Sequence, residues 1–487
     1  MSLQQKAIKG VVWTSLQNWG GQALFFITFL VLARQLGPAT FGLVSMANIF
    51  IHFVQALLGQ GFADAIVQRK DLEDEHLDTA FWANLGIGAL LFLLGLGTAD
   101  LIANAFNQVE LAPIIRVLSF SVVLNSFSST QQAILRRRLD FKSLAARKLI
   151  GQAVGCAVAI SMAIGGFGVW SLVAQQLLNN LVGTLLLWKI SDWRPGFKVS
   201  KRHFKDLFNF GINVIGMNIL VFVSLRSDDL LIGYYLGPVE LGYYTVAYRL
   251  LVTLTQLLTD TVRQVVLPAF ARLQDDKEKV RQAFYTATEL MSFAAFPAFL
   301  GMAVLSPELV LGLFGEQWQP SIPVMQLLAM VGLLRSVFNF SGAVIMALGK
   351  PTWNLILMLL DTLGKVIAFL IAVRWGIVAV AAGLLISTCI FAPLRLWAIY
   401  RLVQLNIRAY LTRYASPLMG AGIMAGSILL CKYVLSAYLN VKVLLGLCIV
   451  LGAVIYLGSI FLMAPQFYQK LIGFARSAAP ASLQKRL

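Results

Sequence analysis

The sequence predicts an all-α integral membrane protein with about fourteen transmembrane helices. Of its 487 residues, 59% are hydrophobic and 13% are charged, whereas a soluble domain has about 45–50% apolar and about 25% charged residues. The apolar residues form long blocks, and residues 11–33 contain no charge at all. About 20 such residues in a helix cross the hydrocarbon core. The blocks are uniformly apolar, without the alternation of a barrel strand, so we expect helices.

Successive apolar blocks define the predicted membrane-spanning helices. They cover residues 11–33, 41–62, 79–101, 113–135, 143–164, 167–188, 208–233, 241–263, 284–305, 322–346, 353–374, 376–398, 415–434 and 443–463.

The net charge of +17 reflects an uneven distribution of Lys and Arg along the chain. About 30 of them lie at even-numbered connections between the predicted helices and about 5 at odd-numbered ones. Examples are Arg136, Arg137 and Arg138 after the fourth helix. Short basic connections stay in the cytoplasm, so both termini are predicted to be cytoplasmic. The basic excess indicates topology and contact with anionic membrane lipids rather than binding of a nucleic acid.

No sequence feature indicates catalysis. The connections leave no room for a soluble catalytic domain, and no phosphate-binding Gly-x-x-x-x-Gly-Lys-Ser/Thr loop is present. The four cysteines lie in apolar blocks without metal-ligand spacing, and the three histidines belong to no catalytic set. The sequence therefore predicts a protein that is not an enzyme and that uses no cofactor and no metal.

An internal repeat runs through the chain. LGPATFG at 36–42 recurs 200 residues later as LGPVELG at 236–242. Two further pairs match in the same order, namely the charged linkers 67–81 and 271–284 and the connections 165–173 and 374–382. One match alone would fit a tight interfacial turn used twice, but three in the same order favour duplication.

The repeat predicts two six-helix lobes related by an axis along the membrane normal. The N-lobe covers residues 1–200 and the C-lobe residues 201–402. Residues 403–487 add two helices and a cytoplasmic tail. Two similar bundles facing each other are typical of transporters that open alternately to the two sides of the membrane.

Ionisable or polar residues inside predicted membrane helices are candidates for substrate binding. A central charge facing lipid costs about 2.5–3.5 kcal/mol, so we expect these side chains to face the protein interior. They are Arg226, Asp228, Asp229, Arg249, Arg335, Asn339, Asp361 and Lys365.

These candidates have two possible roles. They could line a polar cavity with a cationic excess, or they could pair with one another and only fix helix packing. Arg226 and Asp229, three residues apart, and Asp361 and Lys365, four apart, have spacings that allow pairing along one helix. Arginine binds phosphate well, so a cationic cavity would suit a diphosphate or an acidic sugar better than a cationic drug.

Five tyrosines near the ends of the seventh and eighth helices have two possible roles as well. They could stack on sugar rings, but an aromatic belt at the membrane interface is the simpler interpretation. They are Tyr234, Tyr235, Tyr243, Tyr244 and Tyr248.

Four stretches resemble the polysaccharide-transporter branch of the multidrug/oligosaccharidyl-lipid/polysaccharide exporter superfamily, the Wzx-type flippases. They are VLARQLGPATFGLVSMANIF (31–50), SDDLLIGYYLGPVELGYYTVAYRL (227–250), LFGEQWQPSIPVMQLLA (313–329) and MALGKPTWN (346–354). Asp229 matches the acidic position typical of the family's seventh helix.

The resemblance implies a function in the bacterial inner (cytoplasmic) membrane. Such proteins flip undecaprenyl-diphosphate-linked oligosaccharide repeat units outward by alternating access. Polysaccharide polymerase and chain-length machinery are then possible partners. The extra helix pair at 415–463 is shared with lipid II flippases, so lipid II stays an alternative cargo, as does a drug or cation for an antiporter of the same superfamily. A membrane polymerase or ligase is less favoured, because no large outer loop is available for catalytic residues.

Overall fold

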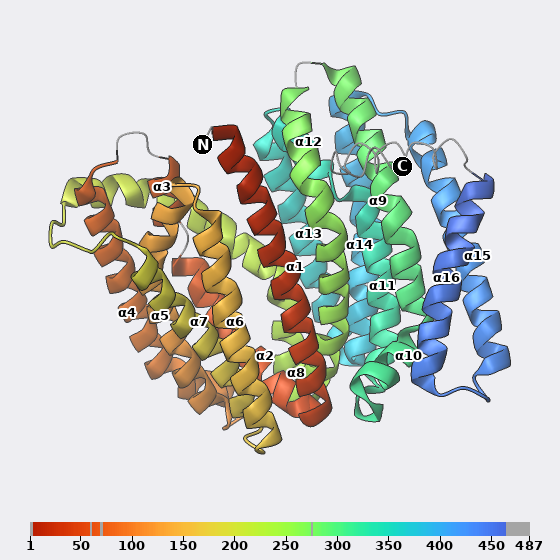
Figure 1. The fold of residues 1–487 in the computed structure, drawn as a ribbon, viewed down its shortest axis with the longest axis horizontal. Helices are drawn as coiled ribbons and strands as arrows, with labels where there is room; N and C mark the ends of the chain where they lie inside the picture. Colours follow the sequence, from red (N-terminus) through yellow and green to blue (C-terminus); the bar gives the residue numbers. More distant parts are fainter. Residues whose placement is uncertain (1–2, 59–60, 69–71, 274–275, 464–487) are drawn as a thin grey trace. The chain divides into compact units, whose positions relative to one another are not determined.

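The computed structural model describes residues 3–58, 61–68, 72–273 and 276–463, without the side chains of residues 3–12, 15–16, 61–62, 64, 201–214, 259–269 and 271–272. Throughout this described part every regular element is a helix (Figure 1), which confirms the predicted all-α membrane architecture. In chain order the α-helices are α1 (Leu3–Gln35), α2 (Pro38–Leu58), α3 (Gly61–Gln68), α4 (Asp74–Ala105), α5 (Leu111–Arg137), α6 (Phe141–Ile164), α7 (Val169–Ile190), α8 (Lys201–Arg272), α9 (Lys277–Val304), α10 (Ser306–Leu309), α11 (Ser321–Phe338), α12 (Ser341–Ala347), α13 (Pro351–Ala372), α14 (Ile377–Val403), α15 (Ile407–Leu435) and α16 (Val441–Met463).

Ten helical segments of the described chain are long and apolar enough to cross a membrane. The other four predicted segments also lie in helices, because α1 contains 11–33, α7 overlaps 167–188, and the 72-residue α8 contains both 208–233 and 241–263. Four amide side chains at 175, 176, 179 and 180 lower the hydropathy of α7. The number fourteen therefore stays a prediction.

The helix predicted over 322–346 is interrupted, which corrects the sequence expectation at Asn339. Helix α11 ends at Phe338, a turn follows, and α12 begins at Ser341. The Ser336 hydroxyl donates to the Leu333 carbonyl (2.6 Å) and the Ser341 hydroxyl donates to the Phe338 carbonyl (2.7 Å). Such bonds from serine side chains back to the helix backbone bend or end helices.

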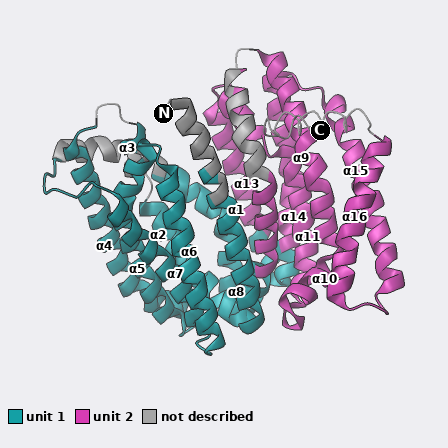
Figure 2. Cartoon of the chain, in the orientation of Figure 1, with its two compact units in different colours: residues 1–245, 369–380 teal, residues 246–368, 381–487 magenta. Residues whose placement is uncertain are grey.

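The chain forms two compact units (Figure 2). Unit 1 contains residues 1–245 and 369–380, and unit 2 contains residues 246–368 and 381–487. The boundary at Thr245 lies later than the predicted lobe boundary at residue 200, because the first part of α8 packs against α2. The two lobes defined by the repeat stay a prediction.

Corresponding repeat positions begin helices in the same way. Gly168 (φ 54°) directly precedes α7, and Gly376 (φ 91°) directly precedes α14, so both sites use the left-handed backbone that glycine adopts readily. Helix α9 begins after Asp276, whose carboxylate accepts from the backbone N–H groups of Glu278 and Lys279. The Lys279 backbone and side chain hold the pKa of Asp276 below its ordinary value. The shared glycine starts of α7 and α14 support an internal duplication.

The two LGP motifs pack reciprocally against each other within unit 1. A Cβ atom added at Gly42 of α2 would lie 1.7 Å from the Pro238 carbonyl oxygen of α8. A Cβ atom added at Gly242 of α8 would lie 2.0 Å from the Pro38 carbonyl oxygen of α2. In each motif, the absence of a side chain on the glycine thus lets the backbone of the other motif approach closely. The reciprocal contacts are those of a local two-fold relation.

Ser45 and Thr245 continue this repeat contact one turn further along both helices. Their hydroxyl groups form a hydrogen bond of 3.1 Å between residues 200 positions apart. We use "repeat contact" for these two residues together with the two Gly–Pro pairs. It brings backbone against backbone, where weak Cα–H···O contacts replace interlocking side chains.

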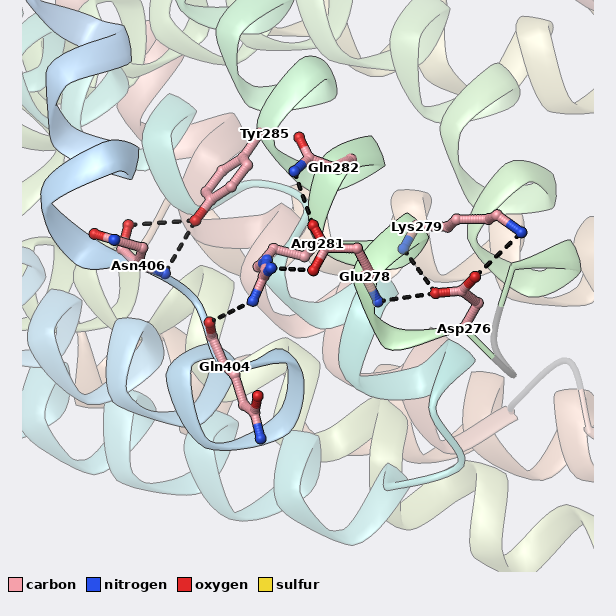
Figure 3. A network of polar contacts seen from close by, with 8 residues as sticks. All are labelled: Asp276, Glu278, Lys279, Arg281, Gln282, Tyr285, Gln404 and Asn406. Carbon is pink, nitrogen blue, oxygen red and sulfur yellow. Dashed lines mark hydrogen bonds and ion pairs between the residues drawn. The ribbon is translucent and has the colours of Figure 1, made fainter.

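The additional helix α15 is fixed to α9 by a polar network within unit 2 (Figure 3). The Arg281 guanidinium donates to the Gln404 carbonyl oxygen (3.1 Å), and the Tyr285 hydroxyl accepts from the Asn406 backbone N–H (3.0 Å). One turn into α15, the Tyr410 ring stacks on Phe284 at 5.6 Å between centroids. These bonds join α9 to the connection before α15.

Substitution of Gly42 by Ala tests the repeat contact. The added methyl group forces backbone away from backbone, and such overpacking costs about 1–3 kcal/mol. We expect Gly42→Ala to lower the thermal unfolding midpoint of the detergent-solubilised protein. The matched control is Gly97→Ala in α4, where nothing lies within 4 Å of the added atom and alanine favours the helix. Equal midpoints for Gly42→Ala and the unsubstituted protein would contradict the close approach.

Candidate functional site

Polar residues of α8 form the first cluster, which lies in unit 1. Arg226 and Asp229 pair along the helix at 2.9 Å between Nη1 and Oδ2. Asp228 points away from this pair and accepts a hydrogen bond of 2.8 Å from the Tyr244 hydroxyl. Both aspartates are buried, at 4% exposed for Asp228 and 7% for Asp229. In this α8 cluster each carboxylate therefore has a donor on the same helix.

The position of Tyr244 differs from the aromatic-belt interpretation. Its side chain is fully buried and its hydroxyl binds Asp228. Tyr234 and Tyr235, by contrast, are 52% and 58% exposed, and their rings contact each other edge to face. Tyr244 follows Asp228 by 16 residues, across the kink at Gly237, so spacing along one straight helix does not reveal the contact.

A second cluster joins three helices of unit 2. Asp361 and Lys365 of α13 form an ion pair of 2.7 Å, and Arg395 of α14 reaches the same Asp361 oxygen at 3.2 Å. Asp361 and Lys365 are 8% and 7% exposed. The pairing predicted from their four-residue spacing is therefore present, with an additional arginine from a neighbouring helix.

Arg335 of α11 adds a third positive charge. It lies close enough to Lys365 to repel its ammonium group, as does Arg395. Among the described residues, Arg335 has no hydrogen-bond or ion-pair partner. We use "α13 cluster" for Asp361, Lys365, Arg395 and Arg335, in which Lys365 and Arg395 share the Asp361 carboxylate and Arg335 lies within electrostatic range of Lys365.

Such an excess of positive charge is unfavourable without an anion. Removing ions from water costs several kcal/mol each unless partners compensate for the lost hydration. One carboxylate neutralises one of the three cations, so the α13 cluster retains a net positive charge in an apolar helix layer. Guanidinium groups donate in a planar fork that matches phosphate and carboxylate oxygens. The α13 cluster is thus chemically suited to an anionic ligand.

The remaining candidates differ in their surroundings. Arg249 of α8 lies in unit 2, where it is half-buried and interacts with a neighbouring group. Arg249 therefore has an interaction partner within the described structure. Asn339 is exposed in the turn after α11, where it no longer continues the helix that carries Arg335.

Two arginines are absent from the residues that the sequence identifies as candidates. They are Arg395, inside the predicted segment 376–398, and Arg147, inside 143–164. Both lie near the end of their segment that adjoins a basic connection, so each is easily assigned to the topology signal of that connection. Their position within the apolar block is the signal that identifies them.

The described residues contain no group of three or more His, Cys, Asp or Glu side chains placed to hold a metal ion. The polar chemistry of both clusters is instead that of amino, guanidinium and carboxylate groups.

Sequence comparison identifies the family of the chain. The family described as "Polysaccharide biosynthesis protein" matches residues 31–323. Lipopolysaccharide biosynthesis protein WzxC of Escherichia coli strain K12 is 31% identical over 349 residues, which are 71% of each chain. Succinoglycan biosynthesis transport protein ExoT of Rhizobium meliloti is 32% identical over 323 residues, covering 66% of this chain and 65% of the relative.

Solved structures share the fold at lower identity. Lipid II flippase MurJ in an inward closed conformation matches with a TM-score of 0.77 and 14% identity, over 95% of this chain and all of MurJ. A multidrug MATE transporter in an inward-facing conformation matches with a TM-score of 0.64 and 19% identity, over 82% of this chain and 99% of the transporter. The chain has the fold of these membrane transporters, and by its sequence it belongs to the polysaccharide biosynthesis protein family.

Proposed function

We propose that this protein flips an undecaprenyl-diphosphate-linked oligosaccharide repeat unit across the bacterial cytoplasmic membrane. The observation that carries the proposal is the α13 cluster, where Lys365 and Arg395 share the Asp361 carboxylate and Arg335 adds a third cation near Lys365. The relatives support the polysaccharide part, since one is named a lipopolysaccharide biosynthesis protein and another a succinoglycan biosynthesis transport protein.

The charges assign a role to the cluster residues. The diphosphate is the part of the cargo that cannot enter hydrocarbon, because an unpaired anion there is strongly disfavoured. Arg335, Lys365 and Arg395 would donate to its oxygens, while Asp361 holds Lys365 and Arg395 in place when no cargo is bound. The prenyl chain would remain in the lipid.

The α8 cluster has a different role in this proposal. Arg226 pairs with Asp229 and the Tyr244 hydroxyl donates to Asp228, so one cation stands beside two carboxylates and the cluster has no surplus of positive charge. Arg249 and Asn339 remain proposed contacts for the polar sugars. The α8 cluster itself would provide a polar surface inside the protein without attracting the diphosphate.

Alternating access gives the repeat contact a function. With both termini in the cytoplasm, the connections at 36–42 and 236–242 lie on the outer side of the membrane. The contact then closes the outer side and has to separate before the cargo leaves. The repeat contact has few polar bonds, one of which is the Ser45–Thr245 hydrogen bond. When the contact opens, water can replace the hydrogen bonds that are lost.

Two other cargoes remain to be distinguished. The fold similarity to MurJ over 95% of the chain favours lipid II as the second candidate, and lipid II also carries a diphosphate. A drug or cation antiporter would need an excess of carboxylates, which is opposite to the α13 cluster. Polymerase and chain-length proteins are proposed partners, because they would use the flipped repeat unit on the outer side.

Lipid analysis of cells that lack this protein tests the cargo. We expect undecaprenyl-diphosphate-linked repeat units to accumulate on the cytoplasmic leaflet and surface polysaccharide to fall, because the diphosphate head cannot cross unaided. Mass spectrometry of extracted lipids and labelling of accessible sugars measure both effects. Accumulated lipid II with normal repeat units would support the second candidate. Drug sensitivity with normal polysaccharide would support an antiporter.

Substitutions in the α13 cluster test its role in binding. We expect Arg335→Gln and Arg395→Gln each to reduce polysaccharide export about tenfold or more, since a hydrogen bond to a charged group contributes about 1.5–3 kcal/mol. Membrane insertion should stay normal for Arg335→Gln, which breaks no ion pair of the described structure. Arg374→Gln, at an exposed arginine, is the matched control. Unchanged export in both cluster variants, with normal protein levels, would exclude a cationic binding site.

A disulfide across the repeat contact tests alternating access. The Ser45 and Thr245 oxygens are 3.1 Å apart, so Ser45→Cys combined with Thr245→Cys should cross-link under mild oxidation. The background should carry Ser at the four native cysteines, Cys156, Cys389, Cys431 and Cys448. We expect export to stop on oxidation and to return with a reductant, while each single substitution continues to export. Normal export by fully cross-linked protein would show that this contact does not open.

A further inference from the structure

Arg147 of α6 is a half-buried cation that the proposed cargo site does not use. Its Nε atom is buried without a hydrogen-bond partner, and within the described chain its guanidinium forms no ion pair. Arg147 lies in the seventh position of a helix that is long and apolar enough to cross a membrane. A guanidinium nitrogen that is buried without a hydrogen-bond partner has lost hydration that an anion bound beside it would compensate, so this position favours an anion.

The charged groups that act on Arg147 make the need for an anion greater. The side chain of Arg136, at the end of α5, lies near enough to repel it, and Arg147 in turn repels Lys148. The nearest carboxylate in the sequence, Asp140, is the N-cap of α6 and accepts from the Ser143 backbone and hydroxyl. Three cations are therefore grouped here, and the described residues supply Arg147 with no carboxylate.

The helix opposite leaves room beside the guanidinium. A Cβ atom added at Gly183 of α7 would lie 3.7 Å from the Arg147 Nη1 atom, so the guanidinium faces bare backbone. One and two turns further along α6, Gly151 and Gly155 bring α7 so close that an added Cβ would lie 2.7 Å and 2.6 Å from backbone oxygens. Arg147 thus lies at the end of the tightly packed part of the α6–α7 pair, next to Gly183.

The surroundings identify the type of ligand. The Lys142 ammonium lies 5.8 Å from the centre of the Trp13 ring of α1, and aromatic and basic residues of this kind mark a membrane interface. With the predicted topology, this end of α6 is at the cytoplasmic leaflet. The anions available at that depth are lipid phosphates, and arginine binds phosphate oxygens through its planar fork.

We propose that Arg147, with Arg136 and Lys148, binds the phosphate of a lipid in the cytoplasmic leaflet. The phosphate belongs either to an anionic phospholipid or to undecaprenyl diphosphate, and only the second source rests on the proposed function. In the second case the site would receive the cargo head group on the cytoplasmic side before transport.

A structural role for Arg147 predicts a different result. If Arg147 mainly packs against α7, its replacement lowers the stability of the ligand-free protein. If Arg147 instead serves to bind an anion, an uncharged side chain of similar length removes an uncompensated charge. The stability of the lipid-free protein then stays the same or rises. Stability and lipid binding should therefore change in opposite directions, which is typical of residues kept for binding.

The experiment compares the purified full-length protein with Arg147→Gln in detergent. Native mass spectrometry titrates two probes separately, phosphatidylglycerol and undecaprenyl diphosphate, and thermal unfolding is measured without added lipid. We expect Arg147→Gln to bind the recognised lipid about tenfold or more weakly with an unfolding midpoint at or above that of the unsubstituted protein. Arg138→Gln is the matched control, since Arg138 is exposed and paired with Asp192 at 3.7 Å.

Each outcome decides the proposal. Weaker binding of phosphatidylglycerol supports a phospholipid site, and weaker binding of undecaprenyl diphosphate alone supports a cargo entry site. Equal binding of both probes by Arg147→Gln and the unsubstituted protein overturns the proposal, as does a lower unfolding midpoint with unchanged binding. If Arg147→Gln does not fold, Arg147→Lys keeps the charge and should keep most of the binding. Failure here leaves the lipid analysis of deletion cells unaffected, so the two proposals are tested independently.

Discussion

Every charge inside the bilayer needs a partner, and the way this protein meets that requirement separates its polar residues by role. In the α8 cluster, Arg226 has Asp229 and Asp228 has the Tyr244 hydroxyl. In the α13 cluster, the single carboxylate of Asp361 pairs with Lys365 and Arg395, and Arg335 adds a third positive charge nearby. Polar groups that have a partner within the protein stabilise helix packing by themselves. Groups with a surplus of one charge are fully compensated only when a ligand of the opposite charge binds.

The helices that carry these groups are joined by contacts of two different strengths. Within unit 1, α2 and the first part of α8 meet through glycine backbones, one hydroxyl pair and the Phe53–Phe222 ring pair. Within unit 2, α15 is joined to α9 by hydrogen bonds to backbone oxygens and by stacked aromatic rings. A contact with few side-chain interactions separates at low cost, whereas an interlocked one does not. The fold thus places its weak contact between the two copies of the repeat and its strong one at the additional helices.

The sequence predicts what depends on local geometry. Apolar length identifies the helices, and the three- and four-residue spacings identify the Arg226–Asp229 and Asp361–Lys365 pairs, because both partners lie on one helix. Arg395 reaches Asp361 from a different helix, and no spacing along the chain encodes that approach. One continuous helix was predicted over 322–346, but α11 ends at Phe338 and Asn339 lies in the turn that follows, a break that apolar length does not reveal.

Fold similarity alone does not choose the cargo, because MurJ and a MATE transporter share this architecture at 14% and 19% identity. In our proposal, the sign of the charge in the α13 cluster makes that choice. A cation would be repelled by the surplus of Arg335, Lys365 and Arg395 over Asp361, whereas a diphosphate would convert that repulsion into attraction. Since the same apolar surroundings that make the surplus costly also strengthen its attraction to an anion, the instability of the empty site is the source of its selectivity.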